Sequence, residues 1–291
     1  VVIGGSGRSV YHDSLEVFSD SAGVWTSPFP PMSTKRSGHA ACYAEVDSEP
    51  RIYVCGGYDG YKWLASCEYL NLSTKKWFTI ASMSTPRNGL AGVLLADGLT
   101  FLVCGGSDGK TCLSSCEKLD LVTHTWSPIT SMRKPRAHHS VVFFRGKAVV
   151  IGGQNNVDSV LSSCEQFDEE SNTWTGLASL NTPRDSFGAV VVNDKIYVAG
   201  GFSSAQTDSI LSSVEVFDGV VWSLLGSSLA SARGMCAAVN FNDNLVVLGG
   251  TGITVEQYDP DTNTWSTTSF PELSLIRLFP AVVALPLDST F

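Results

Sequence analysis

The chain has 291 residues, of which 43% are hydrophobic and 16% charged, so it can bury a large core. Its formal net charge of −9, from 19 basic and 28 acidic residues, argues against general nucleic-acid binding, because phosphate contacts need clustered Lys and Arg. No run of about 18 apolar residues is present, so the sequence predicts no membrane span. Val1 is not Met and no basic and apolar leader precedes the first motif, so we expect a fragment without a secretory signal.

The N-terminal region contains three strand-like stretches, one fewer than each region that follows. Each stretch is bounded by Gly, Ser or Asp, a pattern typical of short strands joined by turns. The three stretches are Val1–Gly5, Ser14–Ser19 and Val24–Ser27. A four-stranded sheet at this end of the chain therefore needs one strand from elsewhere.

The later stretches come in groups of four, as the region from Pro135 to Leu180 illustrates. The polar turn Arg145–Lys147 separates its first two stretches, which we interpret as a hairpin. Gly152-Gly153 ends the second stretch, and two adjacent glycines indicate unusual backbone torsions or a close approach that a Cβ atom excludes. The four stretches are Ser140–Phe144, Ala148–Ile151, Leu161–Phe167 and Thr173–Gly176. Because none has a helical period, the region predicts one antiparallel sheet.

Four landmarks recur six times in the same order along the chain. The first is a Gly-Gly pair at Gly4-Gly5, Gly56-Gly57, Gly105-Gly106, Gly152-Gly153, Gly200-Gly201 and Gly249-Gly250. The second is a glutamate at Glu16, Glu68, Glu117, Glu165, Glu215 and Glu256. The third is a tryptophan at Trp25, Trp77, Trp126, Trp174, Trp222 and Trp265. The fourth is an arginine at Arg36, Arg87, Arg136, Arg184, Arg233 and Arg277. The chain is therefore an array of six repeats.

The repeat length and the Gly-Gly, Glu and Trp landmarks resemble the kelch repeat, which forms one four-stranded β-propeller blade of about 50 residues. The second unit, GGYDGYKWLASCEYLNLSTKKWFTIASMSTPR, is similar to the C-terminal propellers of kelch-like (BTB-kelch) ubiquitin-ligase adaptors. The resemblance implies an all-β, six-bladed propeller that occupies residues 1–291 as a single domain. The expected blades cover residues 1–28 with 279–285, 37–80, 88–130, 138–179, 185–226 and 235–269.

The strand missing from the first blade is expected at the C-terminus. Phe279–Leu285 follows Arg277 as Ser140–Phe144 follows Arg136, and too few residues remain to build another sheet. We therefore expect the C-terminal strand to be the innermost strand of the N-terminal blade. Main-chain hydrogen bonds would then close the ring and leave no free sheet edge.

The arginines are the first candidates for partner binding, because their loops should surround the central channel on one face. In the adaptors that the chain resembles, arginines here and residues after Gly-Gly hold acidic or polar side chains of a peptide, and a guanidinium suits a carboxylate. The matching positions are Arg36, Arg87, Arg136, Arg184 and Arg233, with Tyr58 and Phe202 and the polar counterparts Ser107 and Gln154. In the alternative interpretation, the arginines pair with the blade glutamates or with loop carbonyls.

Two further residues are candidate contacts. Trp63 lies in the loop between Gly57 and Glu68 and has no counterpart among the repeated tryptophans. His138 lies just after Arg136, close to the expected rim, and His39 lies just after Arg36. We interpret the repeated glutamates as anchors for backbone N–H groups or for a neighbouring blade, and the repeated tryptophans as packing between blades.

The resemblance favours a protein-interaction module over an enzyme. The set of His, Tyr and Cys ligands of the galactose-oxidase-like propellers cannot be assembled here, and neither can the iron-ligand spacing of nitrile specifiers. We therefore expect no catalytic residue, metal or cofactor. The implied function is substrate recognition in a cullin-RING ubiquitin ligase, which would contact the cullin through BTB and BACK or F-box domains outside these residues. The alternatives are an actin or cytoskeletal scaffold and, less favoured, a small-ligand enzyme such as a mutarotase.

The eight cysteines are interpreted as reduced thiols. Cys67, Cys116 and Cys164 each precede a blade glutamate, and Cys55 and Cys104 each precede a Gly-Gly pair, so the members of each set lie in different blades. Sheets that face each other are about 10 Å apart, whereas a disulfide needs Cα atoms within about 7 Å. We therefore expect a protein of the cytoplasm or nucleus.

Overall fold

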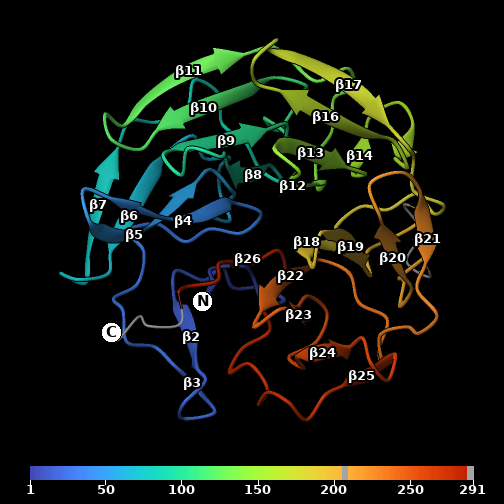
Figure 1. The fold of residues 1–291 in the computed structure, drawn as a ribbon. Coiled ribbons are helices and arrows are strands. Elements are labelled where there is room, and N and C mark those ends of the chain that lie inside the picture. Colours follow the sequence, from blue (N-terminus) through green and yellow to red (C-terminus); the bar gives the residue numbers. More distant parts are fainter. Residues whose placement is uncertain (205–208, 287–291) are drawn as a thin grey trace.

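The computed structural model describes residues 1–204 and 209–286, and these form six four-stranded sheets arranged as blades around a central axis (Figure 1). Within these residues no helix is long and apolar enough to cross a membrane. Each blade has four antiparallel strands, numbered here from the axis outward. The prediction of an all-β, six-bladed propeller is confirmed.

The first three blades follow the chain outward, except where the C-terminus supplies the innermost strand. The first blade consists of β26 (Ala281–Val282), β1 (Val2–Ile3), β2 (Leu15–Ser19) and β3 (Val24–Thr26). The second consists of β4 (Ala40–Val46), β5 (Glu49–Cys55), β6 (Cys67–Asn71) and β7 (Lys76–Ile80). The third consists of β8 (Ala91–Leu94), β9 (Thr100–Cys104), β10 (Cys116–Asp120) and β11 (Thr125–Ile129).

The other three blades repeat this order. The fourth consists of β12 (Ser140–Phe144), β13 (Lys147–Ile151), β16 (Cys164–Asp168) and β17 (Thr173–Leu177). The fifth consists of β18 (Gly188–Val192), β19 (Lys195–Ala199), β20 (Val214–Phe217) and β21 (Trp222–Leu224). The sixth consists of β22 (Cys236–Phe241), β23 (Asn244–Gly249), β24 (Glu256–Asp259) and β25 (Thr264–Ser266). A small extra hairpin, β14 (Gln154–Asn155) with β15 (Ser159–Val160), lies in the fourth blade's Gly-Gly loop.

The ring closes as the sequence predicts, with β26 paired to β1 in the register Val2 opposite Val282. The closing strand is shorter than the predicted Phe279–Leu285. Phe279 has a positive φ of 51°, which is not a strand conformation, and Pro280 has no N–H to give to the ladder. Beyond the strand, Val1 and Val283 still exchange two main-chain hydrogen bonds, at 2.7 and 2.9 Å. The two ends of the described chain therefore lie side by side.

The Gly-Gly pairs have both features that the sequence predicts for them. In the fourth blade, Gly152 and Gly153 have φ values of 54° and 93°, a region that side chains rarely adopt. A Cβ atom on Gly152 would also lie 2.6 Å from the carbonyl oxygen of Arg184 in the next loop. The pairs therefore let each blade approach the next one closely.

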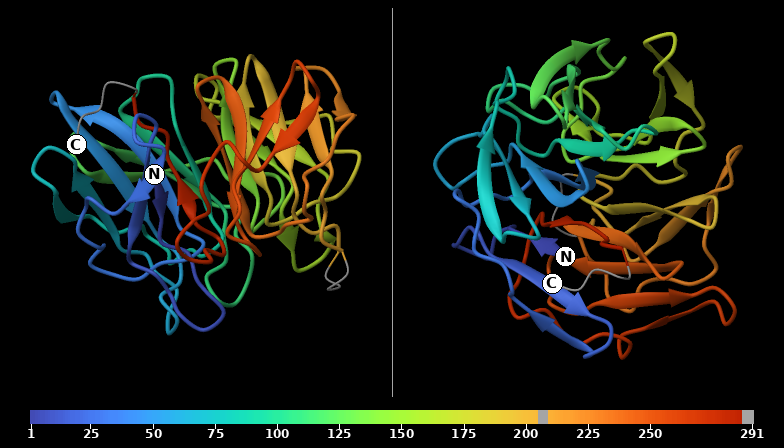
Figure 2. Two further views of the ribbon diagram at one scale, coloured as in Figure 1. Left: turned by 90° about the horizontal axis from the view of Figure 1, so that it is seen from below. Right: turned by 60° about the vertical axis from the view of Figure 1, so that its left-hand side comes forward.

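The core lies mainly between neighbouring blades. In one cluster, Tyr53 of the second blade packs with Phe101 and Leu119 of the third, and all three are fully buried. Five of the six repeated tryptophans join blades through an indole N–H that donates to a main-chain carbonyl, as Trp222 does to Ala178 of the loop that follows the preceding blade, at 3.0 Å. Seen from the side, the loops at the two ends of the strands form two separate faces (Figure 2).

Candidate partner-binding face

One face of the propeller, here called the loop face, is built from two kinds of loop. The Gly-Gly loops join the second and third strands of a blade, and the arginine loops join the fourth strand to the first strand of the next blade. Short antiparallel bridges tie the two together, as between Ser37 and Tyr58 and between Asp185 and Phe202. The residues that follow each arginine and each Gly-Gly pair therefore meet on this face.

The repeated arginines are buried beneath the loop face, which corrects the expectation that they present their side chains to a partner. Each is 2% exposed or less and forms an ion pair with a blade glutamate. The pairs are Arg36–Glu68, Arg87–Glu117, Arg136–Glu165, Arg184–Glu215, Arg233–Glu256 and Arg277–Glu16. Each arginine precedes the innermost strand of the blade that carries its glutamate, and it fixes the loop that enters that blade.

The hydrogen bonds of Arg184 show why the guanidinium is held inside. It donates to the carbonyl oxygens of Gly200 and Ser213 at 3.0 and 2.9 Å, and to Glu215 at 3.0 Å. The second carboxylate oxygen of Glu215 accepts the backbone N–H of Asn181 at 2.7 Å. Because the ion pair also satisfies main-chain groups of both loops, it acts as a loop anchor. The interpretation of the blade glutamates as anchors is confirmed.

A set of aromatic residues lies on the loop face instead. We call Tyr11, Tyr58, Tyr61 and Trp63 the loop row. The ring centroids of Tyr58 lie 5.5 Å from Tyr11 and 5.0 Å from Trp63, so three of the four rings form one cluster. Trp63 is 39% exposed and Tyr61 is 92% exposed. Exposed aromatic side chains that are already held by neighbours are typical anchors of protein interfaces.

Each loop of the row packs on the loop of the next blade. A Cβ atom on Gly60 would lie 2.8 Å from the ring of Tyr11, and one on Gly109 would lie 2.9 Å from the ring of Trp63. In the third blade, the backbone N–H of Cys112 donates to the side-chain oxygen of Asn156 at 3.0 Å. The Gly-Gly loops of blades one to four therefore support one another along a continuous edge.

Tyr58 and Trp63 were predicted from the sequence, whereas Tyr11 and Tyr61 were missed. A signal for Tyr11 is present, because Tyr11, Trp63 and Cys112 each lie six residues after the second glycine of their pair. The structure places these three at equivalent bridges, opposite Ser6, Tyr58 and Ser107 respectively. Tyr61 has no such signal, and only the turn centred on Asp59 exposes it.

The other predicted contacts lie elsewhere on the same face. Phe202 is half-buried and its ring lies against Gly234, so it belongs to the fifth and sixth blades and not to the loop row. Part of the Gly-Gly loop that follows Phe202, residues 205–208, lies outside the described residues. Beside Phe202, burial raises the pKa of the Asp185 carboxyl, which accepts the Ser186 hydroxyl at 2.6 Å.

His138 is half-buried at the mouth of the central channel, within a closed ring of six main-chain hydrogen bonds. The ring members each have a positive φ and each donate an N–H to the preceding member, with N···O distances of 2.7 to 3.0 Å. They are Gly38, Gly89, His138, Ser186, Met235 and Phe279. His138 and Phe279 lie opposite each other in the ring, and their side chains stack at 4.7 Å between centroids. Both residues line the central channel.

The remaining histidines of the channel are held as neutral side chains. Burial, and then the nearby Arg36, lower the pKa of His39 to about 3, and burial lowers the pKa of His139 well below its usual value. Burial also lowers the pKa of His138 to about 4. In the third and fifth blades, Leu90 and Phe187 have the place that His39 and His139 have in their own blades. Among the described residues, no three His, Cys, Asp or Glu side chains are grouped to hold a metal ion.

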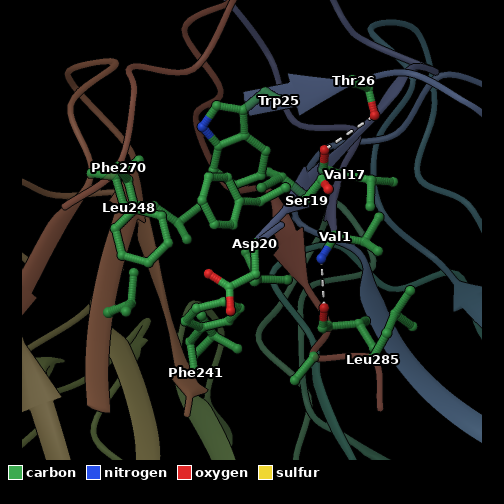
Figure 3. Close-up of a pocket in the computed structure, with 18 of the residues that line it drawn as sticks. Val1, Val17, Ser19, Asp20, Trp25, Thr26, Phe241, Leu248, Phe270 and Leu285 are labelled. Carbon is green, nitrogen blue, oxygen red and sulfur yellow. Dashed lines mark hydrogen bonds between the residues drawn. The ribbon is translucent and has the colours of Figure 1, made fainter. Parts of the chain in front are cut away.

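A cavity of about 790 Å³ lies between the sixth and first blades. Figure 3 shows Trp25, Phe241 and Phe270 around it, with the Asp20 carboxylate pointing into the space. It includes residues 19–22 in the turn between β2 and β3, so it opens at the end of the strands opposite the loop face. The cavity is therefore distinct from the arginine loops and from the loop row.

Comparison with known proteins agrees with the fold. The chain matches the family model of the KLHDC2/KLHL20/DRC7 Kelch-repeats domain over residues 1–201. It is similar to a solved structure titled "Structure of YjhT", with 16% identity, a TM-score of 0.72, and coverage of 88% of this chain and 89% of that chain. That identity is low enough that the likeness shows the fold alone. The search of curated proteins found no similar sequence. Because the family model covers more than half of the 291 residues, this chain belongs to the KLHDC2/KLHL20/DRC7 kelch-repeat family.

Proposed function

We propose that this propeller binds a partner protein on the loop face and acts as the substrate-recognition domain of a cullin-RING ubiquitin-ligase adaptor. The observation that carries the binding proposal is the loop row, in which Tyr61 and Trp63 are exposed on loops braced by their neighbours. Family membership supports a protein partner, since kelch propellers are typically interaction modules. The ligase role rests on the resemblance to the propellers of BTB-kelch adaptors.

The proposed partner presents an apolar or aromatic segment to the loop row. The arginines expected to hold an acidic peptide already have their carboxylates in Glu68, Glu117 and their equivalents. A buried guanidinium that left its glutamate for a ligand would strand a charge inside the protein, at a cost of about 3–5 kcal/mol. Aromatic side chains bind without that cost, because their exposed surface only has to exchange water for the partner.

His138 and Phe202 complete the proposed site as secondary contacts near the channel mouth. His138 is fixed by the ring of main-chain bonds and by its stack on Phe279. Phe202 is fixed against Gly234. We propose that they border the bound segment, and that binding rather than catalysis is the role of this face. The neutral, buried histidines of the channel support that choice.

The test compares a variant of the loop row with a variant that loses one exposed aromatic side chain elsewhere on the propeller. Trp63→Ala with Tyr61→Ala removes the exposed part of the loop row. Phe78→Ala is the matched control, because Phe78 is 41% exposed, against 39% for Trp63, but lies on the outer strand β7. We expect proteins captured by the wild type to be retained by the Phe78 variant and lost by the double variant. Equal capture by all three would reject the loop row as the site.

A second measurement separates the ligase role from a scaffold role. The propeller alone, expressed in cells, should compete with a full adaptor and raise the level of the captured protein. A cytoskeletal scaffold would instead sediment with filamentous actin and leave that level unchanged. If the propeller sedimented with actin and Trp63→Ala abolished this, the result would favour the scaffold function over the ligase function.

A further inference from the structure

Two blades carry a pair of cysteines directly opposite each other on neighbouring strands. In the second blade, Cys55 at the end of β5 faces Cys67 at the start of β6. In the third blade, Cys104 of β9 faces Cys116 of β10 in the same way. All four thiols are buried, at 0% or 1% exposure. In the sequence these cysteines fall into two sets, one before the Gly-Gly pairs and one before the blade glutamates. The structure brings one member of each set together within a blade.

The hydrogen-bond pattern shows which kind of strand pair these cysteines form. The N–H of Gly56 donates to the carbonyl oxygen of Ser66 at 3.2 Å, just beyond the pair of Cys55 and Cys67. Bonded and non-bonded pairs alternate along an antiparallel ladder, so the cysteines form a non-hydrogen-bonded pair, with Cα atoms about 4.5 Å apart. That separation is within the range of about 4.4–6.8 Å that disulfides adopt.

The third blade repeats this geometry, because the N–H of Gly105 donates to the carbonyl oxygen of Ser115 at 3.1 Å. Other blades hold one thiol or none at the same pair of positions. In the fourth blade Ile151 faces Cys164, and in the fifth Ala199 faces Val214. The two dithiols are therefore a local departure from an apolar pair and not a feature of every blade.

Each dithiol closes the base of one Gly-Gly loop on the loop face. Cys55 and Cys67 enclose the residues that include Tyr58, Tyr61 and Trp63. Cys104 and Cys116 enclose Gly109, on which Trp63 packs. A disulfide at each place would link the second and third strands of that blade covalently, directly beneath the loop row.

We propose that Cys55–Cys67 and Cys104–Cys116 are redox-active dithiols that a peroxide converts into two disulfides, each within one blade. In each pair, one thiolate attacks a peroxide oxygen, the O–O bond breaks, and one water leaves with a sulfenic acid on that sulfur. The facing thiol then attacks this sulfur, the S–S bond forms and a second water leaves. Each pair thus gives up two electrons and two hydrogens, and one hydrogen peroxide is reduced to two waters.

The oxidation has to be slow while the protein is fully folded, because the four thiols are buried. Burial, and then the neighbouring Cys67, raise the pKa of the Cys55 thiol, and burial with Cys116 does the same for Cys104. Thiolate therefore forms when the end of the ladder opens briefly, and the oxidation rate follows that opening. The half-buried Cys112, on a loop, should react with peroxide before either pair.

The test uses the whole chain, reduced and then exposed to hydrogen peroxide, in buffer and in urea below the unfolding midpoint. Free thiols are alkylated, the protein is digested, and linked peptides are identified by mass spectrometry. We expect links between Cys55 and Cys67 and between Cys104 and Cys116, each reversed by a reductant. Their rate should rise several-fold in urea, while the circular dichroism spectrum stays that of the folded protein.

Two variants make the assignment specific. Cys67→Val, which copies Val214 of the fifth blade, should abolish the second-blade link and leave the third-blade link unchanged. Ile151→Cys places a thiol opposite Cys164 and should add a third link of the same kind. Recovery of alkylated Cys55, Cys67, Cys104 and Cys116 after Cys112 has been consumed would overturn the proposal. So would links that form only above the unfolding midpoint, or links to Cys42 in place of Cys55–Cys67. The chemistry does not depend on the proposed function, so loss of partner binding in the loop-row variant leaves this result intact.

Discussion

The six buried arginine–glutamate pairs lie beneath the loop face that carries the loop row, so charge lies inside and aromatic surface outside, which reverses their usual arrangement. The ion pairs repeat in every blade and are buried, whereas the loop row occurs in two blades and exposes Tyr61 and Trp63. A residue that every blade needs serves closure and packing, which all blades share. A residue that departs from the repeat is free to serve a partner. In a repeat protein, the exceptions to the pattern are therefore the stronger guide to function.

The largest test of this comparison is to break one ion pair. Arg184→Ala leaves Glu215 buried without its cation and removes donors from the carbonyl oxygens of Gly200 and Ser213. We expect the free energy of unfolding to fall by about 3–5 kcal/mol, measured by urea denaturation. A loss below about 1 kcal/mol would show that the pair is no anchor.

A double variant sharpens that result. Arg184→Met with Glu215→Leu removes both charges and fills the space with apolar groups, so it should be more stable than the single variant, since no charge is left unpaired. The main-chain carbonyls would still lack their donor, so full recovery is not expected.

The next effect is a loss of stability in acid, carried by the neutral histidines under the loop face. His39 has a folded pKa of about 3, below the usual unfolded value of about 6.5. Between these values the unfolded chain binds more protons, so stability is full above pH 6.5 and falls as the pH falls. At pH 5 the expected cost is about 2 kcal/mol for His39, with the same direction for His139.

Urea denaturation at pH 7 and pH 5 measures this loss. His139→Leu should reduce it, because Leu90 has the same place in the third blade and does not titrate. If the variant lost as much free energy of unfolding between pH 7 and pH 5 as the wild type, other groups would be responsible for the acid sensitivity.

A smaller effect is expected where the loop row packs on the Gly-Gly loop of the third blade. Gly109 has a φ of 92°, and Gly109→Ala would place a Cβ atom 2.9 Å from the ring of Trp63. We expect a stability loss of about 1–2 kcal/mol together with weaker partner binding. Gly146→Ala is the control, because Gly146 has a similar φ of 79° but nothing within 4 Å of the added atom. Equal binding by the two variants would mean that the position of Trp63 does not matter.

The smallest effect on stability is expected from the loop row itself. Trp63→Ala with Tyr61→Ala should change the free energy of unfolding by about 1 kcal/mol or less, because Tyr61 is almost fully exposed and Trp63 is partly exposed. The same variant should lose the partner. If thermal unfolding showed a loss comparable to that of Arg184→Ala, the loop row would be part of the scaffold.

Most of the fold could be predicted from sequence because its cause is local and repeated. The strand Ser140–Phe144 follows from a run of β-branched and aromatic residues. The closure of the first blade follows from its missing strand and from the stretch Phe279–Leu285 after Arg277. The extra hairpin of Gln154–Asn155 with Ser159–Val160 could not be predicted, since three of its four residues are polar and Val160 is its only typical strand residue.

The residues of the candidate site could be predicted in part. Trp63 was identified because it has no counterpart in the repeat, and Tyr58 because it follows a Gly-Gly pair; the structure places the two rings together. The arginines were misassigned, because a sequence shows how often a charge recurs but not whether a carboxylate lies beneath it. Only the three-dimensional register brings Arg184 to Glu215, 31 residues later. The same register pairs Cys55 with Cys67.

The six ion pairs differ in how far apart their two residues lie along the chain. Five of the six join residues 23 to 32 positions apart, whereas Arg277 and Glu16 are 261 positions apart. Closing a loop about nine times longer costs about 2 kcal/mol more in chain entropy. The five local links can therefore form early, one after another along the chain. The sixth has to wait for the two ends to meet, so docking of the C-terminal strand should be the late, rate-limiting event in refolding.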